Sequence, residues 1–150
     1  MLTFAVESYR KVVHELKELY PRHWEELALD KDEIALDPDY ERYMSFDLAG
    51  MIHLFTARDG RKLVGYFIFI VLPSLHYKKS LQAYYDIFYL LPEYRKGWNG
   101  IRFVRFAESS LKKAGVQKMY VGVKLNHDFG KVFEYLNFQP AERIYTKLIG

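Results

Sequence analysis

The stretch that decides the fold is Tyr84 to Asn99, YYDIFYLLPEYRKGWN. An apolar and aromatic run typical of a strand stops at Pro92, and a cationic turn containing Gly97 follows before a long amphipathic pattern begins. The first backbone N–H groups of a helix have no intrahelical acceptor and lie at the positive end of the helix dipole. This order therefore predicts an anion-binding turn at the start of a helix, suited to a phosphate or pyrophosphate.

The composition restricts the class of protein. The chain has 150 residues, of which 50% are hydrophobic and 17% aromatic, so we expect one domain with one core. It has no cysteine, which excludes a disulfide framework, a thiolate metal site and a cysteine nucleophile, and the five histidines show no metal-ligand spacing. A net charge of +3 is too small to indicate a nucleic-acid partner. No apolar run reaches the ~18–20 residues that span a bilayer, and the start of the chain lacks a secretory cleavage pattern. We therefore expect a cytoplasmic protein with no membrane partner.

The rest of the chain reads as a mixed α/β domain covering residues 1–150. Hydrophobic periodicity predicts helices over 7–29, 40–49, 99–114 and 128–136, with the first divided or kinked at Pro21. Strand patterns cover 51–56, 63–72, 81–91, 118–125 and 143–149, and Asp59-Gly60 predicts a hairpin between the first two. The order predicts an antiparallel meander followed by a βαβ unit.

Two motifs in this order resemble those of the GNAT superfamily of acetyl-CoA-dependent N-acetyltransferases. Pro92-Glu93-Tyr94-Arg95 is similar to the family's Pro-x-Tyr-Arg step, and the turn from Arg95 to Gly100 is similar to its glycine-containing turn. The segment from Asn126 to Phe138 is similar to a second family segment. The resemblance implies a mixed, mostly antiparallel sheet with two splayed parallel strands and flanking helices. The stretch from Tyr20 to Glu26, followed by Asp37-Pro38-Asp39, resembles a bacteriophage-type subset.

The resemblance implies acetyl-CoA as co-substrate. By the resemblance, the pyrophosphate binds to the turn, whose residues are Arg95, Lys96, Gly97, Trp98, Asn99 and Gly100. The pantetheine arm binds to Asn126 and to backbone groups around Phe88 and Leu90. The Leu90 N–H is a candidate donor to the oxyanion. Trp98 stands where the family has a glycine, and Phe133 where it has a tyrosine that protonates the departing thiolate. These departures leave a second hypothesis open, a weakly active or inactive binding module such as a virion component or host-factor inhibitor.

Catalytic residues are expected on the same strand. Asp86 interrupts an aromatic run, and burying a carboxylate is costly. The resemblance implies that a carboxylate at this place serves as the base, usually through water. The alternative is a structural carboxylate that accepts hydrogen bonds from backbone or tyrosine groups. Either water or a tyrosine protonates the departing thiolate, and among the strand's tyrosines Tyr89 is our candidate, with Tyr84 and Tyr85 as the others.

The resemblance implies a small-molecule or protein amine as the acceptor, and the sequence leaves a homodimer open. His23 and Glu26 lie in the helical region that, according to the resemblance, borders the binding site of the acceptor. The acidic segment from Asp30 to Ala49 either rims the cleft, which would favour a cationic amine, or forms a solvated surface.

Overall fold

A five-stranded sheet in the order β1-β2-β3-β4-β5 forms the centre of the computed structural model, which describes residues 1–150. The strands are β1 (Thr3–Glu7), β2 (Ile52–Asp59), β3 (Lys62–Pro73), β4 (Leu81–Leu90) and β5 (Lys118–Tyr120). Neighbours from β1 to β4 are antiparallel, and β4 pairs with β5 in parallel. The predicted mixed α/β class is confirmed.

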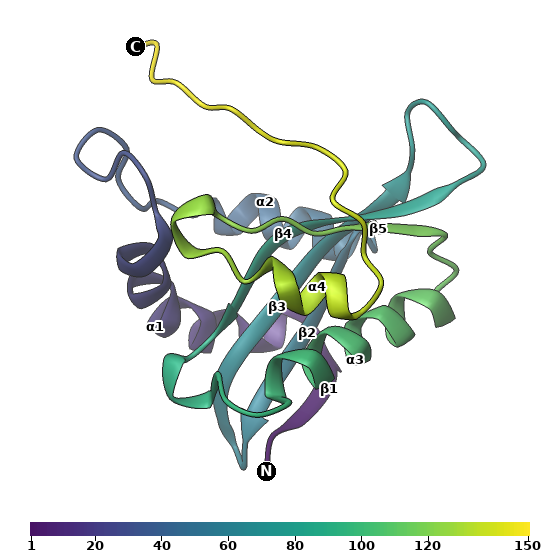
Figure 1. Ribbon diagram of the computed structural model, residues 1–150, viewed down its shortest axis with the longest axis horizontal. Helices are drawn as coiled ribbons and strands as arrows, with labels where there is room; N and C mark the ends of the chain where they lie inside the picture. The colour runs from purple at the N-terminus through teal and green to yellow at the C-terminus, as the bar shows by residue number, and fades with distance from the viewer.

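Four α-helices cover the two faces of the sheet. They are α1 (Tyr9–Leu27), α2 (Tyr40–Leu48), α3 (Asn99–Lys113) and α4 (Gly130–Tyr135), with short 3₁₀ turns at Pro92–Tyr94 and Leu125–His127. Figure 1 shows α1 and α2 behind the sheet and α3 and α4 in front of it. None of the helices combines the length and the apolar character needed to cross a membrane.

The core forms because β3 is apolar on both faces. Most of its residues are buried, as the continuous apolar run predicts. Phe67 is fully buried, and its ring centroid lies 4.2 Å from that of Phe88 and 6.2 Å from that of Phe103 on α3. Tyr66 is also fully buried and packs edge-on against Tyr20 of α1 at 5.6 Å. Successive residues of β3 thus join the sheet to both helix layers.

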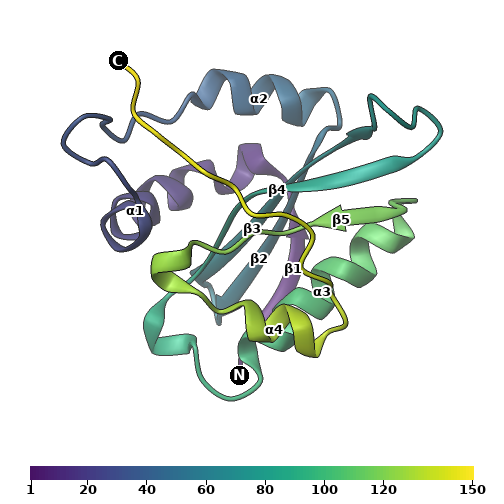
Figure 2. The ribbon, with the colours of Figure 1, turned by 45° about the horizontal axis from the view of Figure 1, so that its top comes forward.

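Pro21 lies inside α1 and bends the helix without dividing it. The helix is continuous from Tyr9 to Leu27, and Figures 1 and 2 show its last turns changing direction relative to its first part. Proline removes one helical hydrogen bond and crowds the preceding turn, which explains the bend. The predicted kink is confirmed, and beyond it the ring of His23 stacks on Tyr89 near the end of β4.

The strands of the structure differ from the predicted ones in three places. The N-terminal residues form β1, where the sequence suggested no strand, and they pair with β2 from Thr3 opposite Arg58 to Glu7 opposite Leu54. Residues 143–149 form no strand, and Figures 1 and 2 show the yellow end of the chain leaving the sheet without pairing with β5. The strand predicted over 118–125 ends at Tyr120.

That early end of β5 creates a splay. The β4–β5 ladder comprises Gln82 opposite Lys118, Ala83 opposite Met119 and Tyr84 opposite Tyr120, and it ends there. β4 continues to Leu90 without a strand on that side. The backbone edge of β4 beyond Tyr84 is therefore open toward the chain that follows β5.

Candidate active site

A cavity of about 340 Å³ opens at the splay. One wall is β4, and the chain beyond β5 forms the opposite wall; the end of α1, the loop after it and α2 close the remaining side. The residues that line it are Tyr20, His23, Trp24, Leu27, Ala28, Leu36, Pro38, Tyr43, Tyr85, Asp86, Ile87, Phe88, Gly122, Val123, Lys124, His127 and Phe129. Of the predicted site residues, Asp86, Phe88 and His23 are brought together here.

Asp86 reaches the cavity because β4 has a β-bulge. Ile68 of β3 pairs with Ile87 and the next residue, Phe69, pairs with Tyr85, so Asp86 has no partner on β3. In a regular strand Asp86 would share the face of Phe88, whose ring packs against Phe67 and Phe103. The bulge instead gives its carboxylate to the opposite face, toward α2.

A tyrosine of α2 holds this carboxylate. Tyr43 Oη donates a hydrogen bond to Asp86 Oδ2. Burial raises the pKa of Asp86, and the hydrogen bond from Tyr43 opposes that shift in part. Asp86 is therefore a more basic carboxylate than an exposed aspartate. That property suits a group that accepts a proton from an amine or from a water molecule beside it.

His23 presents a neutral ring to the cavity. Its Nδ1 is hydrogen-bonded to Tyr66 Oη at 2.7 Å, and its ring stacks on Tyr89 with centroids 4.4 Å apart. Burial lowers the pKa of His23 to about 4, with a smaller contribution from the nearby Arg95. His23 is uncharged at neutral pH, so it adds no repulsion toward a cationic ligand.

The predicted anion-binding turn offers free donors. The N-cap residue of α3 is Trp98, and no side chain caps the helix. The backbone N–H groups of Lys96, Gly97, Trp98, Gly100 and Ile101 have no acceptor in the chain. Gly97 has φ = +59°, and a Cβ added at Gly97 or Gly100 would meet no atom within 4 Å. The turn therefore combines unpaired N–H groups with open space beside them.

The side chains of the turn have other roles. Asn99 Nδ2 donates to the Tyr94 carbonyl at 2.9 Å and so closes the turn. Trp98 is 60% exposed, and its ring lies 5.9 Å from that of Tyr135 on α4. Apart from the exposed ammonium group of Lys96, the turn's donors to an anion are thus backbone groups, which a tryptophan supplies as well as a glycine does.

Arg95 and Glu26, predicted to bind different ligands, bind each other. Arg95 Nη2 donates to Glu26 Oε2 at 2.8 Å, and Nη1 donates to Glu26 Oε1. Arg95 Nε donates to the Leu90 carbonyl at 2.6 Å, and Nη1 lies 3.4 Å from His127 Nε2 at the cavity. Hydrogen bonding from Arg95 lowers the pKa of Glu26. The bidentate pair joins the turn to α1 and neutralises both charges.

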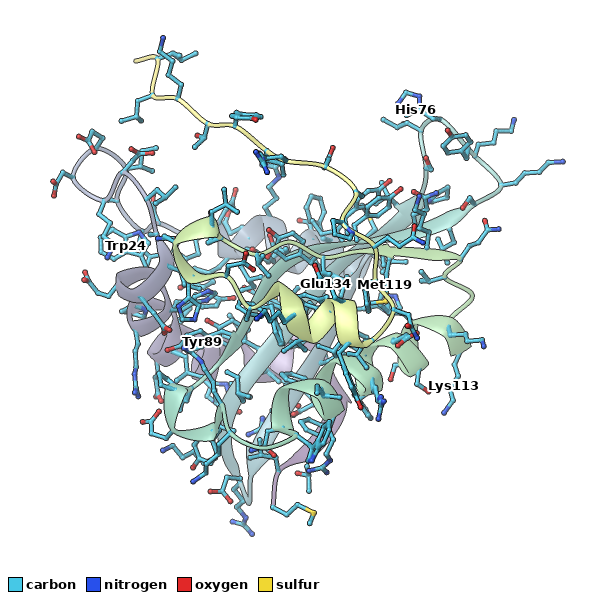
Figure 3. All side chains as sticks on the ribbon, viewed as in Figure 1. Trp24, His76, Tyr89, Lys113, Met119 and Glu134 are labelled. Carbon is cyan, nitrogen blue, oxygen red and sulfur yellow. The ribbon has the colours of Figure 1, made fainter.

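Tyr89 and Leu90 lie outside the cavity. Both are buried, and the Tyr89 ring lies between His23 and the guanidinium of Arg95, 5.3 Å from the latter. Tyr89 Oη is buried without a hydrogen-bond partner. The structure does not bring this hydroxyl to Asp86. Figure 3 shows Tyr89 among the side chains between the sheet and the turn, and Trp24 on the last turns of α1.

Asn126 and Phe133 lie on the segment after β5. Asn126 is exposed in the 3₁₀ turn between Lys124 and His127, which line the cavity, although Asn126 itself does not. Phe133 is buried and packs against Phe88 at 6.3 Å. Phe133 therefore supports the cavity from behind.

Two contributors were missed by sequence reasoning as site residues. Tyr43 has no local signal, because its importance depends on the distant bulge at Asp86. Gly122 lies against the side chain of Tyr85, and a Cβ there would be only 2.6 Å from Tyr85 Oη. The Tyr85 hydroxyl is thus held at the splay by a position that only glycine fills without displacement.

No protein-family model matches the sequence, and a search of curated proteins found no match. Solved structures do match. An aminoglycoside acetyltransferase from an uncultured soil metagenomic sample, in complex with sisomicin, aligns with a TM-score of 0.73 at 15% identity, over 99% of this chain and 95% of that one. A predicted acetyltransferase from Clostridium acetobutylicum with acetyl-CoA gives 0.73 at 15% identity, over 99% and 96%. A transcriptional regulator from Bacillus halodurans C-125 gives 0.75 at 15% identity, over 99% and 100%.

The chain has the GNAT fold. The agreement covers almost the whole chain, so the fold implied by the two motifs is confirmed. At 15% identity the likeness extends to the fold and not to the roles of single residues. Nothing in the comparisons supports the bacteriophage-type resemblance.

Proposed function

We propose that this chain transfers an acetyl group from acetyl-CoA to a primary amine by direct transfer in a ternary complex. The observation that carries the proposal is the cavity at the splay, which joins the open edge of β4 to a half-buried carboxylate, Asp86. One end of the site can hold an extended acyl carrier, and the other can hold and deprotonate an amine.

The residues present fit acetyl-CoA. The free N–H groups of the turn and the dipole of the 15-residue α3 suit a pyrophosphate. Beyond Tyr84 the unpaired edge of β4 can hydrogen-bond the amide groups of a pantetheine arm as a neighbouring strand would. Arg95 contacts His127, a cavity residue, so the turn and the cavity are adjacent. Acetyl-CoA would supply the acetyl group as a thioester.

The reaction needs one proton removed and one donated. The amine nitrogen attacks the thioester carbonyl carbon, so that a C–N bond forms while the C–S bond breaks. Asp86, or a water molecule that it orders, takes the proton from the amine. Tyr43, which donates to Asp86, keeps the carboxylate directed into the cavity.

Tyr85 is the proton donor to the departing thiolate in this proposal, in place of Tyr89. It lines the cavity, and its hydroxyl has no hydrogen-bond partner in the chain. Tyr84 is less suitable, because its hydroxyl donates to Gln82 Oε1 at 3.0 Å and its ring stacks on Tyr120. Burial raises the pKa of Tyr85, so it keeps its proton at neutral pH.

Thermal unfolding with acetyl-CoA tests the proposal. Because a ligand of the native state stabilises it, acetyl-CoA at about 100 times its Kd adds about 2.7 kcal/mol, which corresponds to a rise in Tm of roughly 5–10 °C for a chain of this size. Release of free CoA in the presence of primary amines then tests the transfer. If acetyl-CoA at millimolar concentration leaves Tm unchanged, the proposal is wrong and the non-catalytic hypothesis takes its place.

A pair of helix variants locates the binding. Gly100→Ala fills the open space beside the turn, while alanine favours the helix by up to about 1 kcal/mol. We expect this variant to be as stable as the unmodified protein or more so, and to lose most of the stabilisation by acetyl-CoA. Ser109→Ala, at an exposed position of the same helix, is the matched control and should keep it.

A further inference from the structure

The side of the cavity away from the splay is mostly apolar and aromatic. We call it the acceptor wall, and it consists of Tyr20, Trp24, Leu27, Ala28, Leu36, Pro38 and Tyr43. It is built from the end of α1 on both sides of the bend, the loop that follows and the first turns of α2. Such a wall binds hydrocarbon and aromatic groups, and it offers few partners to hydroxyl groups.

Asp86 is the only carboxylate that lines the cavity. Glu26 is neutralised by Arg95 and lies outside the lining. The acidic residues between Asp30 and Ala49 also lie outside it, and Asp39 is occupied as the N-cap of α2, where it accepts from Arg42 N at 3.0 Å. The segment that could have formed an acidic rim therefore adds no charge to the cavity, whose lining has one carboxylate, that of Asp86, and one ammonium group, that of Lys124.

The size of the cavity limits the acceptor further. At about 340 Å³ it lies at the lower end of the range for ligand sites, about 300–1,000 Å³. In the proposed reaction the same space also holds the acetyl end of the thioester. An acceptor of several rings would exceed the remaining room.

We propose that the acceptor is a small primary amine with one ammonium group on an aryl or alkyl skeleton, an inference that rests on the proposed acetyl transfer. The ammonium group would lie by Asp86 and the rings of Tyr20 and Tyr43, which can attract a cation through their faces. The skeleton would lie against Trp24, Leu36 and Pro38. A polyamine or aminoglycoside would leave further ammonium and hydroxyl groups against apolar side chains without partners.

The two tryptophans separate the two binding events. Trp24 lies in the acceptor wall and Trp98 in the anion-binding turn, and the chain has no other tryptophan. In a Trp98→Phe variant, fluorescence reports the acceptor wall alone. In a Trp24→Phe variant, it reports the turn. Thermal shifts of the unmodified protein with the same ligands provide a second measurement if either variant fails to fold.

The experiment titrates the Trp98→Phe variant with 2-phenylethylamine, hexylamine, spermidine and sisomicin, with and without CoA. We expect the first two to change Trp24 fluorescence at concentrations at least tenfold lower than the last two. Asp86→Asn should weaken 2-phenylethylamine about tenfold or more, because a hydrogen-bonded charge is lost, and should leave the neutral analogue 2-phenylethanol unchanged. Leu36→Glu, which adds a second carboxylate, should reduce the difference in affinity between spermidine and hexylamine.

The inference would be overturned if spermidine or sisomicin bound as tightly as the monoamines. It would also be overturned if Asp86→Asn lost affinity for 2-phenylethylamine and for 2-phenylethanol to the same extent. Acetyl-CoA titrated into the Trp24→Phe variant tests the proposed function separately. If the protein selects monoamines but does not respond to acetyl-CoA, the inference about the ligand of the cavity holds and the proposed acetyl transfer is refuted. If it responds to acetyl-CoA but does not select monoamines, the proposed acetyl transfer keeps its support and the inference about the acceptor is refuted.

Discussion

Gly122→Ala tests whether the position of the Tyr85 hydroxyl matters for catalysis. A Cβ at this position would lie 2.6 Å from Tyr85 Oη, 2.8 Å from Cε1 and 2.9 Å from Cζ, whereas ordinary contact begins at 3.4 Å. The hydroxyl would have to withdraw by about 0.8 Å. Because the atoms in conflict belong to the far end of a side chain, the ring can turn away while the backbone stays in place.

The expected result is a loss of rate with little loss of stability. A misplacement of about 1 Å can cost roughly 100-fold in rate, so we expect kcat to fall about 10- to 100-fold. Alanine reduces the freedom of the unfolded chain, which stabilises by about 0.4–1 kcal/mol and offsets part of the strain. Tm should therefore change by only a few degrees. Steady-state kinetics and thermal unfolding of the same preparation measure both.

A double-mutant cycle with Tyr85→Phe separates the displacement of the hydroxyl from a second possible effect, crowding of acetyl-CoA at the splay. Once the hydroxyl is absent, Gly122→Ala should add little further loss of kcat, since the two changes remove the same proton donor. Any rise in KM for acetyl-CoA that comes from crowding at the splay should persist in the double variant. Additive losses of kcat, or a Gly122→Ala variant with unaltered kcat, would refute the assignment of Tyr85.

Two further substitutions test charged groups. Burial raises the pKa of Asp86, so its ionisation destabilises the fold as pH rises above the unfolded pKa near 3.8. The Asp86→Asn variant should therefore have the same Tm as the unmodified protein near pH 3 and a higher Tm at pH 7. Its kcat should no longer rise with pH. Arg58 pairs with Glu7 at 2.8 Å and Glu15 at 2.8 Å and lowers the pKa of both, so their stabilisation is present above the unfolded pKa near 4.5 and lost as pH falls through the lowered folded values. Arg58→Met should thus cost about 2 kcal/mol at pH 7 and clearly less near pH 3 by urea unfolding, and an equal cost at both would contradict the ion-pair account.

The parts of the fold that could be predicted are those with local causes. The Asp59-Gly60 hairpin forms with Asp59 opposite Lys62, and Asn137 adopts φ = +67° at the end of α4, as its left-handed propensity suggests. α3 ends with Gly115 at φ = +91°, beyond Ala114. In each case a single residue's backbone preference decides the local structure.

The errors concern segments whose structure depends on a partner. Residues 143–149 have the apolar composition of a strand, but no strand lies beside them, and Ile144 and Tyr145 are exposed. The apolar residues before Ser8 read equally well as the start of a helix, and pairing with β2 makes them a strand. Periodicity indicates which face of a segment is apolar, whereas the presence of a neighbour is a property of the whole fold.

The site shows the same division. Asp86 could be found from sequence, since a carboxylate in an aromatic strand requires a cause. Its direction could not, because the bulge is a matter of register between β3 and β4, and one residue of register changes the face on which a side chain lies. Tyr43 and Gly122 contribute only through this geometry.

The pairing of Arg95 with Glu26 has a consequence for both ends of the site. The sequence assigns the cation to the pyrophosphate and the anion to the amine, yet each is bound by the other in a pair whose side chains are only 28% and 22% exposed. With both neutralised, attraction for an anion at the turn comes from the free backbone N–H groups and the exposed Lys96, and attraction for a cation in the cavity comes from Asp86. Backbone dipoles are fixed by the fold and have no pKa, so the anion site should be insensitive to pH over the range where Asp86 titrates. Binding of acetyl-CoA and deprotonation of the amine would then have separate electrostatic origins, and a substitution at Asp86 should leave the first intact while it abolishes the second.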